Sequence, residues 1–523
     1  MDHLSGLDAS FLYLETPETP MHVGGVNVVE LPAGYTGDFV DDFRRHITSR
    51  MHLAPVFQRK LVNMPFELAN PIWVADDDLD LEYHIRSTVL PKPGSRAQLD
   101  KLVGRLHSSL LDRSRPLWEF YVIEGLASPP DAPKGTRHVA IYGKVHHAAL
   151  DGAGGIVLAN AIMDTGPIPR QVRAAPHRRT VQSDNFGVAE LALSGLKNTA
   201  QQTAKLAKML PGLASSLVGA LRASAADSGN KTDWFGPKTP LNVSVTNQRL
   251  FSSFSIPLSE AKFIAKANEA SLNDVVMAIC SGALRHYLAD RGCTPKAPLL
   301  AAVPVSLREA GNTDLNNQVS MMRVSLASTV ADPLERLQTI CKSSTVAKAT
   351  SASMKSVTPT DFPSLGAPWL ISGLASLFGR SKLANSMAPL ANVAISNVPG
   401  PTFALYIAGG KILTYFPVSI AVHSLALNVT VQSYNGSLDF GLTACRKALP
   451  DLPELTRHML EAHQELLKLT RACAVPAQAA AVPAKKAAVK KPVAKKAVPQ
   501  PAKKAVKKAA SAPARSRRAA KSA

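Results

Sequence analysis

Two adjacent histidines, followed by an aspartate and a glycine, are the residues of this chain whose types and spacing best suit chemistry. His146 and His147 precede Asp151 and Gly152, which gives the pattern HHxxxDG. A histidine can act as a general base near neutral pH because its unperturbed pKa is about 6.5. Imidazole and carboxylate groups also bind metals, so a metal site and a purely structural pair are the alternative interpretations. A metal is disfavoured because no third His or Cys lies at a recognisable ligand spacing.

The residues around the motif predict a strand, a tight turn and a helix. The alternating run 138–145 is typical of a half-buried strand, Asp151 and Gly152 predict a turn, and the apolar stretch 156–163 predicts a helix. Successive strand residues face opposite ways, so only one histidine can face a given site. His147 has the parity of the odd-numbered apolar residues of the strand. We therefore expect it on their side and His146 on the other.

The 523 residues are enough for two or three domains. Residues 1–180 mix strand-like and helix-like segments, which predicts an α/β half. We expect a helical connector and linker over 181–240 and a second mixed half over 241–468. The expected elements of both halves are 23–29, 39–48, 99–111, 118–123, 139–145, 299–304, 319–326 and 428–431. The clearest helix is 271–289, with Ser271 as its N-cap and Asp274 in its first turn.

Most of the positive charge lies in the C-terminal segment. Residues 474–523 hold eleven lysines, three arginines and no acidic residue, which leaves about +6 of the net charge of +20 for the rest. Lys-Ala-Pro repetition without aromatic residues predicts a disordered tail. We expect non-specific attraction to polyanions and no sequence-specific reading of DNA.

Cysteine usage and hydropathy indicate the compartment. The five cysteines are scattered and form no CxxC, which favours a reducing compartment and argues against zinc. The first residues lack a basic region followed by an apolar one, and no run of about 18 apolar residues occurs. We expect a cytoplasmic protein that is not secreted and has no transmembrane helix.

Two segments are candidates for contact with a lipid surface. Residues 205–222 place five leucines at helical spacing beside Lys205, Lys208 and Arg222, a pattern that suits an interfacial helix. Packing against the protein's own core is the alternative, and Pro211–Gly212 would break the helix midway. A shorter candidate is 369–378. We therefore expect peripheral attachment to a membrane or a lipid inclusion.

Several further blocks accompany the motif. In chain order they are LSGLDASFL (4–12), PMHVG (20–24), LDRSRPLWE (111–119), LNDVV (272–276), PVSLR (304–308), NQVS (317–320), SNVPGP (396–401) and LNVTVQSY (427–434). Together with HHxxxDG, this ordered set resembles the bacterial wax ester synthase/acyl-CoA:diacylglycerol acyltransferase family over residues 1 to about 465. HHxxxDG alone is less specific, because condensation domains and other CoA-dependent acyltransferases also carry it.

The resemblance implies two chloramphenicol-acetyltransferase-like α/β halves with the motif at their interface. It implies transfer of a long-chain acyl group from acyl-CoA to diacylglycerol, to a long-chain alcohol, or to both. His147 would be the general base, supported by His146, with no acyl-enzyme, cofactor or metal. Gly152 would serve the turn. Asp151 would be structural, with Arg308 as its expected partner and Arg115 and Arg249 as lesser candidates.

Other blocks suggest supporting residues. Asn273 and Asn397 lie in family motifs and can each donate an N–H to an oxyanion, although a role as helix or turn caps is an equal alternative. Pro116, Leu117 and Trp118 are the candidates for lining a substrate channel.

Two other functions stay open from the sequence. One is a condensation-type or polyketide-lipid acyltransferase that takes acyl groups from a carrier protein. The other, of a different class, is a basic scaffold that coats lipid granules or DNA, which only residues 474–523 support. The sequence does not specify the oligomeric state.

Overall fold

The computed structural model describes residues 2–64, 69–129, 132–150, 152–173, 235–306, 319–355 and 385–480. Several predictions lie outside these residues. They concern Asp151, Arg308, both candidate lipid-binding segments, almost all of the 181–240 connector and the basic tail beyond Ala480.

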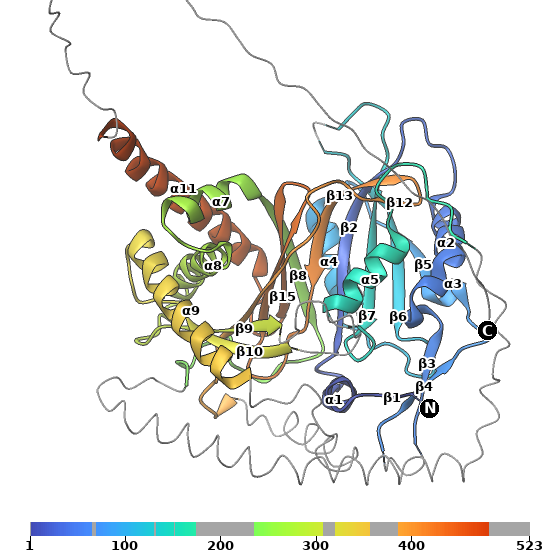
Figure 1. Ribbon diagram of the computed structural model, residues 1–523, viewed down its shortest axis with the longest axis horizontal. Coiled ribbons are helices and arrows are strands. Elements are labelled where there is room, and N and C mark those ends of the chain that lie inside the picture. Colours follow the sequence, from blue (N-terminus) through green and yellow to red (C-terminus); the bar gives the residue numbers. More distant parts are fainter. Residues whose placement is uncertain are drawn as a thin grey trace, which may run out of the picture. The chain divides into compact units, whose positions relative to one another are not determined.

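A six-stranded sheet carries the motif (Figure 1). Its strand order is β12-β13-β2-β7-β6-β5. The motif strand β7 (His138–His146) lies between β2 (His22–Glu30) and β6 (Trp118–Leu126) and pairs antiparallel with both. β6 pairs parallel with β5 (Ile85–Val89). The predicted strand 139–145 is confirmed, but the prediction that it is half-buried is wrong, since β7 is almost continuously buried because helices cover both faces of the sheet.

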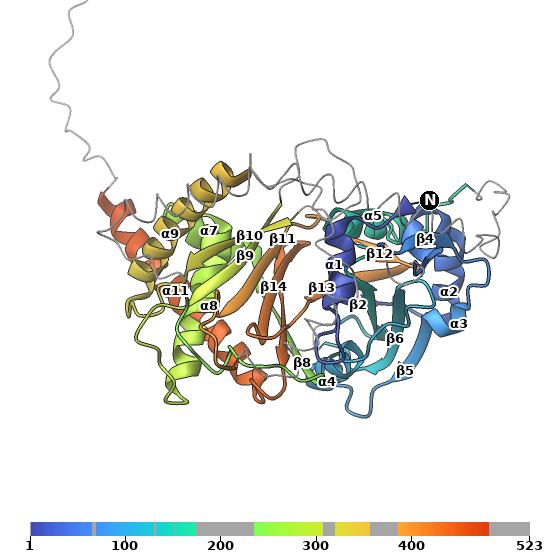
Figure 2. The ribbon, with the colours of Figure 1, turned by 90° about the horizontal axis from the view of Figure 1, so that it is seen from below.

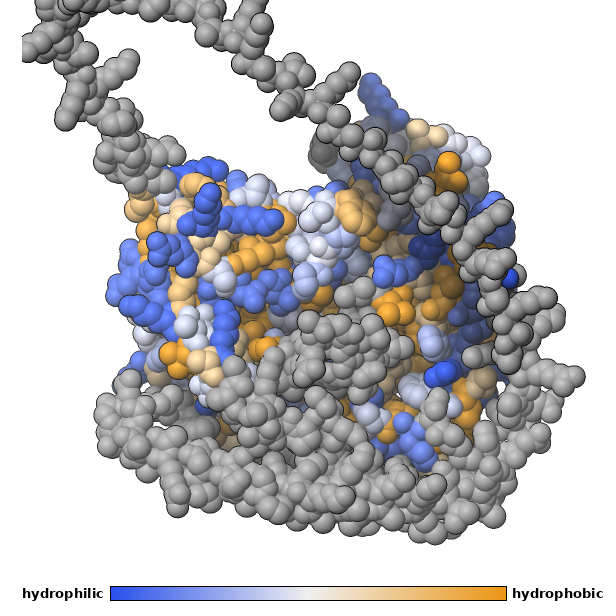
Figure 3. All heavy atoms as spheres, in the orientation of Figure 1, coloured by the Kyte–Doolittle hydropathy of each residue, from blue (hydrophilic) through white to orange (hydrophobic). Residues whose placement is uncertain are grey.

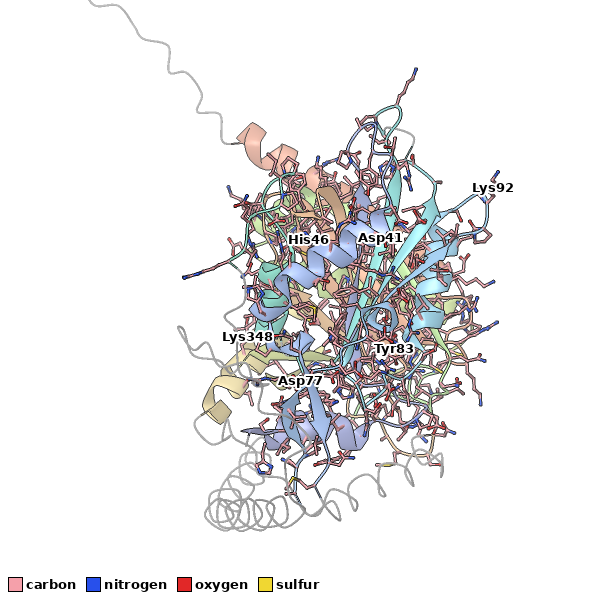
Figure 4. All side chains as sticks on the ribbon, turned by 90° about the vertical axis from the view of Figure 1, so that its right-hand side faces the viewer. Asp41, His46, Asp77, Tyr83, Lys92 and Lys348 are labelled. Atoms are coloured by element: carbon pink, nitrogen blue, oxygen red, sulfur yellow. The ribbon has the colours of Figure 1, made fainter. Side chains whose placement is uncertain are left out.

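Helices α2 (Phe39–Arg50) and α5 (Gly152–Ile162) pack on one face of this sheet, and α4 (Arg96–His107) packs on the other. α5 begins four residues before the predicted start at 156, and α4 ends before the predicted limit of 111. Figure 4 shows α2, with Asp41 and His46 labelled, beside α5. The His46 imidazole contacts the Ile162 carbonyl oxygen at 2.6 Å, which joins the two helices.

A small three-stranded sheet lies beside the motif turn. It is formed by β1 (Asp2–His3), β4 (Ile72–Ala75) and β3 (Arg59–Val62). Helix α1 (Gly6–Leu14) follows β1, with Ser5 as its N-cap. Short 3-10 turns η1 (Met51–Leu53) and η2 (Pro55–Phe57) and the short helix α3 (Leu81–His84) complete this region.

The second six-stranded sheet has the order β10-β9-β11-β14-β15-β8. Its strands are β8 (Arg249–Pro257), β9 (Leu300–Ser306), β10 (Val319–Ser325), β11 (Val393–Val398), β14 (Leu427–Tyr434) and β15 (Ser437–Cys445). Helices cover one of its faces (Figures 1 and 2). They are α7 (Leu258–Ala267), α8 (Leu272–Ala289), α9 (Pro333–Lys355) and α11 (Leu452–Ala480). Hydrophilic side chains lie over the outer surface of these helices (Figure 3).

The start of α8 confirms the predicted cap. Ser271 Oγ accepts a hydrogen bond from the Asp274 N–H, and the Asp274 carboxylate accepts one from the Ser271 N–H. This reciprocal pair satisfies two amide groups that the first turn of a helix leaves without partners. Asp274 also accepts a hydrogen bond from Ser344 Oγ of α9 at 2.6 Å, so the cap helps to pack α8 against α9.

A strand from the C-terminal half joins the N-terminal sheet. β12 (Tyr406–Ile407) and β13 (Gly410–Val418) lie within the expected 241–468 half, yet β13 pairs antiparallel with β2. β13 also contacts the second sheet, where the Tyr415 N–H donates to Asp439 Oδ2 at 2.7 Å. β12 and β13 of the expected C-terminal half therefore belong to the sheet of the first half, while the boundary at 241 stays a prediction. Contacts unite residues up to Val475 in one unit.

The predicted start of the disordered tail is also corrected. α11 continues through Ala480, although we expected disorder from Ala474. The alanines of the extension AVPAQAA favour continuation of the helix, whereas Pro476, which has no N–H to donate, opposes it.

Candidate active site

The backbone of the motif is held by both neighbouring strands. β7 ends at His146, whose N–H donates to the Leu117 carbonyl oxygen at 3.0 Å. The His147 N–H donates to the Met21 carbonyl oxygen at 2.8 Å, and the Ala149 N–H closes a turn onto the His146 carbonyl oxygen at 2.9 Å. The motif therefore leaves the strand as a fixed tight turn before α5.

The His146 imidazole is buried, with an exposed fraction of 1%. Its Nδ1 accepts the Ala148 N–H at 3.1 Å, which places the proton on Nε2. That Nε2 lies 3.2 Å from Oε2 of Glu15. Because both ring nitrogens face protein groups, His146 does not present a nitrogen to a substrate.

Glu15 is the buried carboxylate of the site, and no motif of the sequence pointed to it. Its Oε1 accepts from Arg113 Nη2 at 2.8 Å, and its Oε2 accepts from the Met21 N–H at 3.0 Å. Burial alone raises the pKa of a carboxyl group. The hydrogen bond from His146, the charge of Arg113 and the Met21 N–H outweigh burial and lower the pKa of Glu15 to about 2. Glu15 thus stays ionised.

The ring of His147 has different surroundings. It stacks on Phe11 of α1, with a centroid distance of 4.1 Å and an interplanar angle of 10°. Its residue is half-buried, unlike that of His146. Strand parity does not fix the direction of the His147 ring, because the strand ends at His146 and the turn sets that direction. The two rings nevertheless differ in surroundings, as we expected.

The two candidate oxyanion donors are brought together, but they bond to each other. Asn273 lies in the first turn of α8, Asn397 lies in β11, and Asn397 Nδ2 donates to Asn273 Oδ1. Ser271, not Asn273, caps α8. The oxyanion role of these two residues stays a prediction.

The Pro-Leu-Trp block supports the motif from behind. Leu117 and Trp118 have no exposed surface, and Pro116 is also buried. Leu117 packs against Ala148 of the motif turn, while Trp118 Nε1 donates to the Phe57 carbonyl oxygen at 3.3 Å. We expected these residues to line a channel. The structure places them in packed core, where Leu117 fixes His146 through its carbonyl group.

Both lesser candidates for the Asp151 partner have other contacts. Arg115 lies over the ring of Tyr83 (labelled in Figure 4) at 4.1 Å and within 3.6 Å of Asp80 and Asp112.

Gly152 is the first residue of α5 rather than part of the turn at 147–149. Because Asp151 and Arg308 lie outside the described residues, their pairing stays a prediction.

Arg249 joins the two halves through carbonyl groups. It is buried and donates to the carbonyl oxygens of Glu18, Thr246 and Ala421. Burial lowers the pKa of Arg249 to about 10. Its role in the described structure is to bridge the N-terminal segment and the loop after β13.

Neither a metal site nor a membrane-spanning helix is found among the described residues. There, no group of three or more His, Cys, Asp or Glu side chains is placed to hold a metal ion. Within the same ranges, no helix is both long and apolar enough to cross a membrane.

Comparison with known proteins identifies the family. Residues 4–276 match the wax ester synthase/diacylglycerol acyltransferase catalytic domain, and residues 315–467 match the WS/DGAT C-terminal domain. The chain belongs to the wax ester synthase/diacylglycerol acyltransferase family. The family resemblance inferred from the ordered sequence blocks is thereby confirmed, and the chain is an acyltransferase of this family.

Relatives of this WS/DGAT chain match over most of their length. A Mycobacterium tuberculosis protein named as a diacylglycerol O-acyltransferase is 33% identical over 480 residues, which cover 90% of each chain. A similarly named Mycobacterium bovis protein is 36% identical over 488 residues, covering 90% of this chain and 91% of the relative.

Solved structures confirm the expected fold. The wax ester synthase/diacylglycerol acyltransferase of Marinobacter aquaeolei VT8 is 30% identical, with a TM-score of 0.63, and the match covers 90% of this chain and 99% of that one. A trichothecene 15-O-acetyltransferase of Fusarium sporotrichioides, at 11% identity and a TM-score of 0.53, shares the fold alone. The match covers 88% of this WS/DGAT chain and 94% of that one.

Proposed function

We propose that this WS/DGAT chain transfers a long-chain acyl group from acyl-CoA to the hydroxyl group of diacylglycerol, of a long-chain alcohol, or of both. His147 is the general base in this proposal, and no acyl-enzyme forms. The relatives' names support the substrate classes, since they describe diacylglycerol O-acyltransferases and a wax ester synthase.

The contrast between the two histidines carries the assignment of the base. Both ring nitrogens of His146 face protein groups, and its side chain is almost fully buried. His147 is half-buried, and its backbone is fixed by Met21 while its ring is stacked on Phe11. A general base must lie within about 3 Å of the atom that carries the proton it removes. His147 is therefore the histidine of the motif that suits contact with substrate.

The chemical step needs an alcohol, a thioester and a general base. His147 takes the hydroxyl proton as the alcohol oxygen attacks the thioester carbonyl carbon. The carbon–sulfur bond then breaks, and protonated His147 returns the proton to the leaving thiolate of CoA. The ester and free CoA are the products. General base catalysis of this kind typically contributes about 10² to 10⁴ in rate.

Labelled palmitoyl-CoA, offered hexadecanol and dipalmitoylglycerol in separate reactions, tests the proposal. We expect labelled wax ester, labelled triacylglycerol or both, with release of free CoA. Ester formation only from acyl groups on a carrier protein would favour the condensation-type alternative. If no acyl donor gave an ester, the acyltransfer proposal would fail and the scaffold alternative would gain support.

The lipid character of these substrates implies peripheral attachment to a membrane or a lipid inclusion. The basic tail and the amphipathic 205–222 segment are the proposed anchors, and both are supported by sequence alone. Each Lys or Arg near an anionic leaflet contributes about 1 kcal/mol to binding. Chelators should leave turnover unchanged, since the proposed step uses no metal.

A further inference from the structure

The guanidinium group of Arg249, the first residue of β8, binds backbone carbonyl oxygens from three separate segments. Its Nη2 donates to the Glu18 carbonyl oxygen at 2.5 Å and to that of Ala421 at 3.0 Å, and its Nη1 donates to that of Thr246. Arg249 is buried, and in the described part of the chain no carboxylate forms an ion pair with it. Because a buried cation is costly unless its donors are satisfied, these carbonyl groups are what holds the guanidinium in place.

Helix α4 of the first half fixes the backbone of Arg249. The Arg249 N–H donates to Oγ of Ser108, the C-cap of α4, at 2.9 Å. The helix also approaches β8 so closely that a Cβ atom on Gly104 would lie 2.9 Å from the Arg249 carbonyl oxygen. Arg249 therefore has a fixed place at the contact between the halves, and its guanidinium is a rigid support for the segments it binds.

One of these segments, the 15–21 loop, contacts both histidines of the motif. Glu15 Oε2 lies 3.2 Å from His146 Nε2, and the Met21 carbonyl oxygen accepts the His147 N–H at 2.8 Å. The Met21 N–H donates back to Glu15 Oε2 at 3.0 Å and closes the loop. Glu18, which Arg249 binds, is the central residue of this loop in sequence.

The 15–21 loop is stiff enough to transmit a displacement. The Thr19 N–H donates to the Thr16 carbonyl oxygen at 3.0 Å, the hydroxyl groups of Thr16 and Thr19 hydrogen-bond at 2.9 Å, and Thr19 Oγ1 donates to the Leu14 carbonyl oxygen at 3.2 Å. Arg113 of the first half holds the start of the loop through Glu15 Oε1 at 2.8 Å. One arginine from each half thus supports the loop that contacts the motif.

We propose that Arg249 is a positioning residue for the general base His147 and ties the place of the motif turn to the second half. The inference rests on the proposed acyltransfer function. Binding three carbonyl groups at once needs the fixed planar donors of a guanidinium, whereas a lysine keeps the charge but not this geometry. Without the guanidinium, the 15–21 loop is held from the first half alone, and the turn that carries His147 is free to shift.

Arg249→Lys tests the proposal, with Arg336→Lys as the matched control. Arg336 of α9 is also buried and donates to two carbonyl oxygens, those of Val330 and Ala331, but in the described structure it does not contact the 15–21 loop. Both variants should lower the thermal midpoint. Only Arg249→Lys should lower kcat per folded molecule, by about 10²-fold, because a shift of about 1 Å in an active site costs that much.

The KM for palmitoyl-CoA should stay within about twofold of the wild-type value, since the loop contacts the histidines rather than the substrate in this proposal. A wild-type kcat in Arg249→Lys would overturn the proposal. Ser108→Ala, which removes only the acceptor of the Arg249 N–H, keeps the test available if Arg249→Lys does not fold. Its kcat should fall about fivefold, and an unchanged kcat would also overturn the proposal.

A double-mutant cycle separates positioning from a general loss of stability. Arg249→Lys and Glu15→Gln act through the same loop, so their effects on kcat should not add. The double variant should lose little more than the worse of the two single variants. Fully additive losses in kcat would show that Arg249 does not act through the 15–21 loop.

Hydrogen exchange measures the same link without turnover. With the amides of β14 as internal reference, peptides that contain Met21 and His147 should exchange at least about tenfold faster in Arg249→Lys and at the wild-type rate in Arg336→Lys. Unchanged exchange in Arg249→Lys would overturn the positioning role. If the wild type formed no ester from any acyl donor but exchange changed as expected, the proposed function would fail while the link from Arg249 to the motif would stand.

Discussion

Glu15 Oε2 lies 3.2 Å from Nε2 of His146, and both side chains are almost fully buried, with exposed fractions of 2% and 1%. The same Oε2 accepts the Met21 N–H, while the Met21 carbonyl oxygen accepts the His147 N–H. Glu15 therefore contacts His146 directly and reaches His147 through the backbone of Met21. It is a positioning residue for the proposed base rather than a group that contacts substrate.

Glu15→Gln should lower turnover, and it should lower stability more at neutral pH than at acid pH. Loss of the carboxylate loosens the turn that fixes His147, and displacements of about 1 Å in an active site can cost about 10²-fold in rate. The pKa of Glu15 is lowered from 4.5 to about 2, so its stabilising effect is present above pH 4.5 and is lost as pH falls toward 2. That effect amounts to about 3 kcal/mol at neutral pH.

Unfolding in urea at pH 7 and pH 3, together with kcat at pH 7, measures both effects. Glu18→Gln is the matched control three residues away. Wild-type kcat in Glu15→Gln would refute the positioning role, even if stability fell.

Asp100 should make the contact between the halves sensitive to pH. Its carboxylate accepts the Ser253 N–H at 3.0 Å and Ser253 Oγ at 2.8 Å, which links α4 to β8. Burial raises the pKa of Asp100 to about 6, against the lowering effects of Arg96 and Ser253. Its contribution to stability is therefore fully present below its unfolded value of 3.8 and is lost as pH rises through about 6.

Raising the pH from 5 to 8 should thus lower the free energy of unfolding by about 1–2 kcal/mol, because Asp100 ionises while buried. Asp100→Asn should remove that part of the pH dependence, because the amide does not ionise. The measurement is the free energy of unfolding of both proteins at the two pH values. Identical pH dependence in the two proteins would show that Asp100 has no raised pKa.

Deleting residues 481–523 should weaken electrostatic attachment without affecting catalysis. The deletion removes fourteen cations and leaves α11 complete. We expect unchanged turnover on detergent-dispersed substrate and reduced co-sedimentation with anionic vesicles at about 50 mM salt, with little difference at about 500 mM. Equal vesicle binding by full-length and truncated protein at both salt concentrations would exclude the tail as an anchor.

The sequence predicted the elements whose signals are local. The alternating pattern that marks β7 and the Ser271 cap of α8 depend on neighbouring residues, and both are confirmed. Glu15 was missed because it precedes His146 by more than a hundred residues and carries no periodic signal. The pairing of β13 with β2 could not be predicted for a similar reason, since the sequence of a strand does not specify which sheet it joins.

The predicted channel residues show a second limit of the sequence. Pro116, Leu117 and Trp118 resemble an apolar channel wall in sequence, yet burial separates core from channel and is not visible in a single sequence.

The role of His147 is tested most directly by single-turnover ester formation from palmitoyl-CoA in His147→Ala, with His146→Ala and the exposed His286→Ala for comparison. We expect His147→Ala to lose about 10² to 10⁴ in rate while its thermal midpoint stays near that of the wild type. His146→Ala should lose less rate and more stability because it leaves Glu15 without its buried partner, and His286→Ala should match the wild type. A His147→Ala protein that forms ester at near wild-type rate would contradict the proposed mechanism.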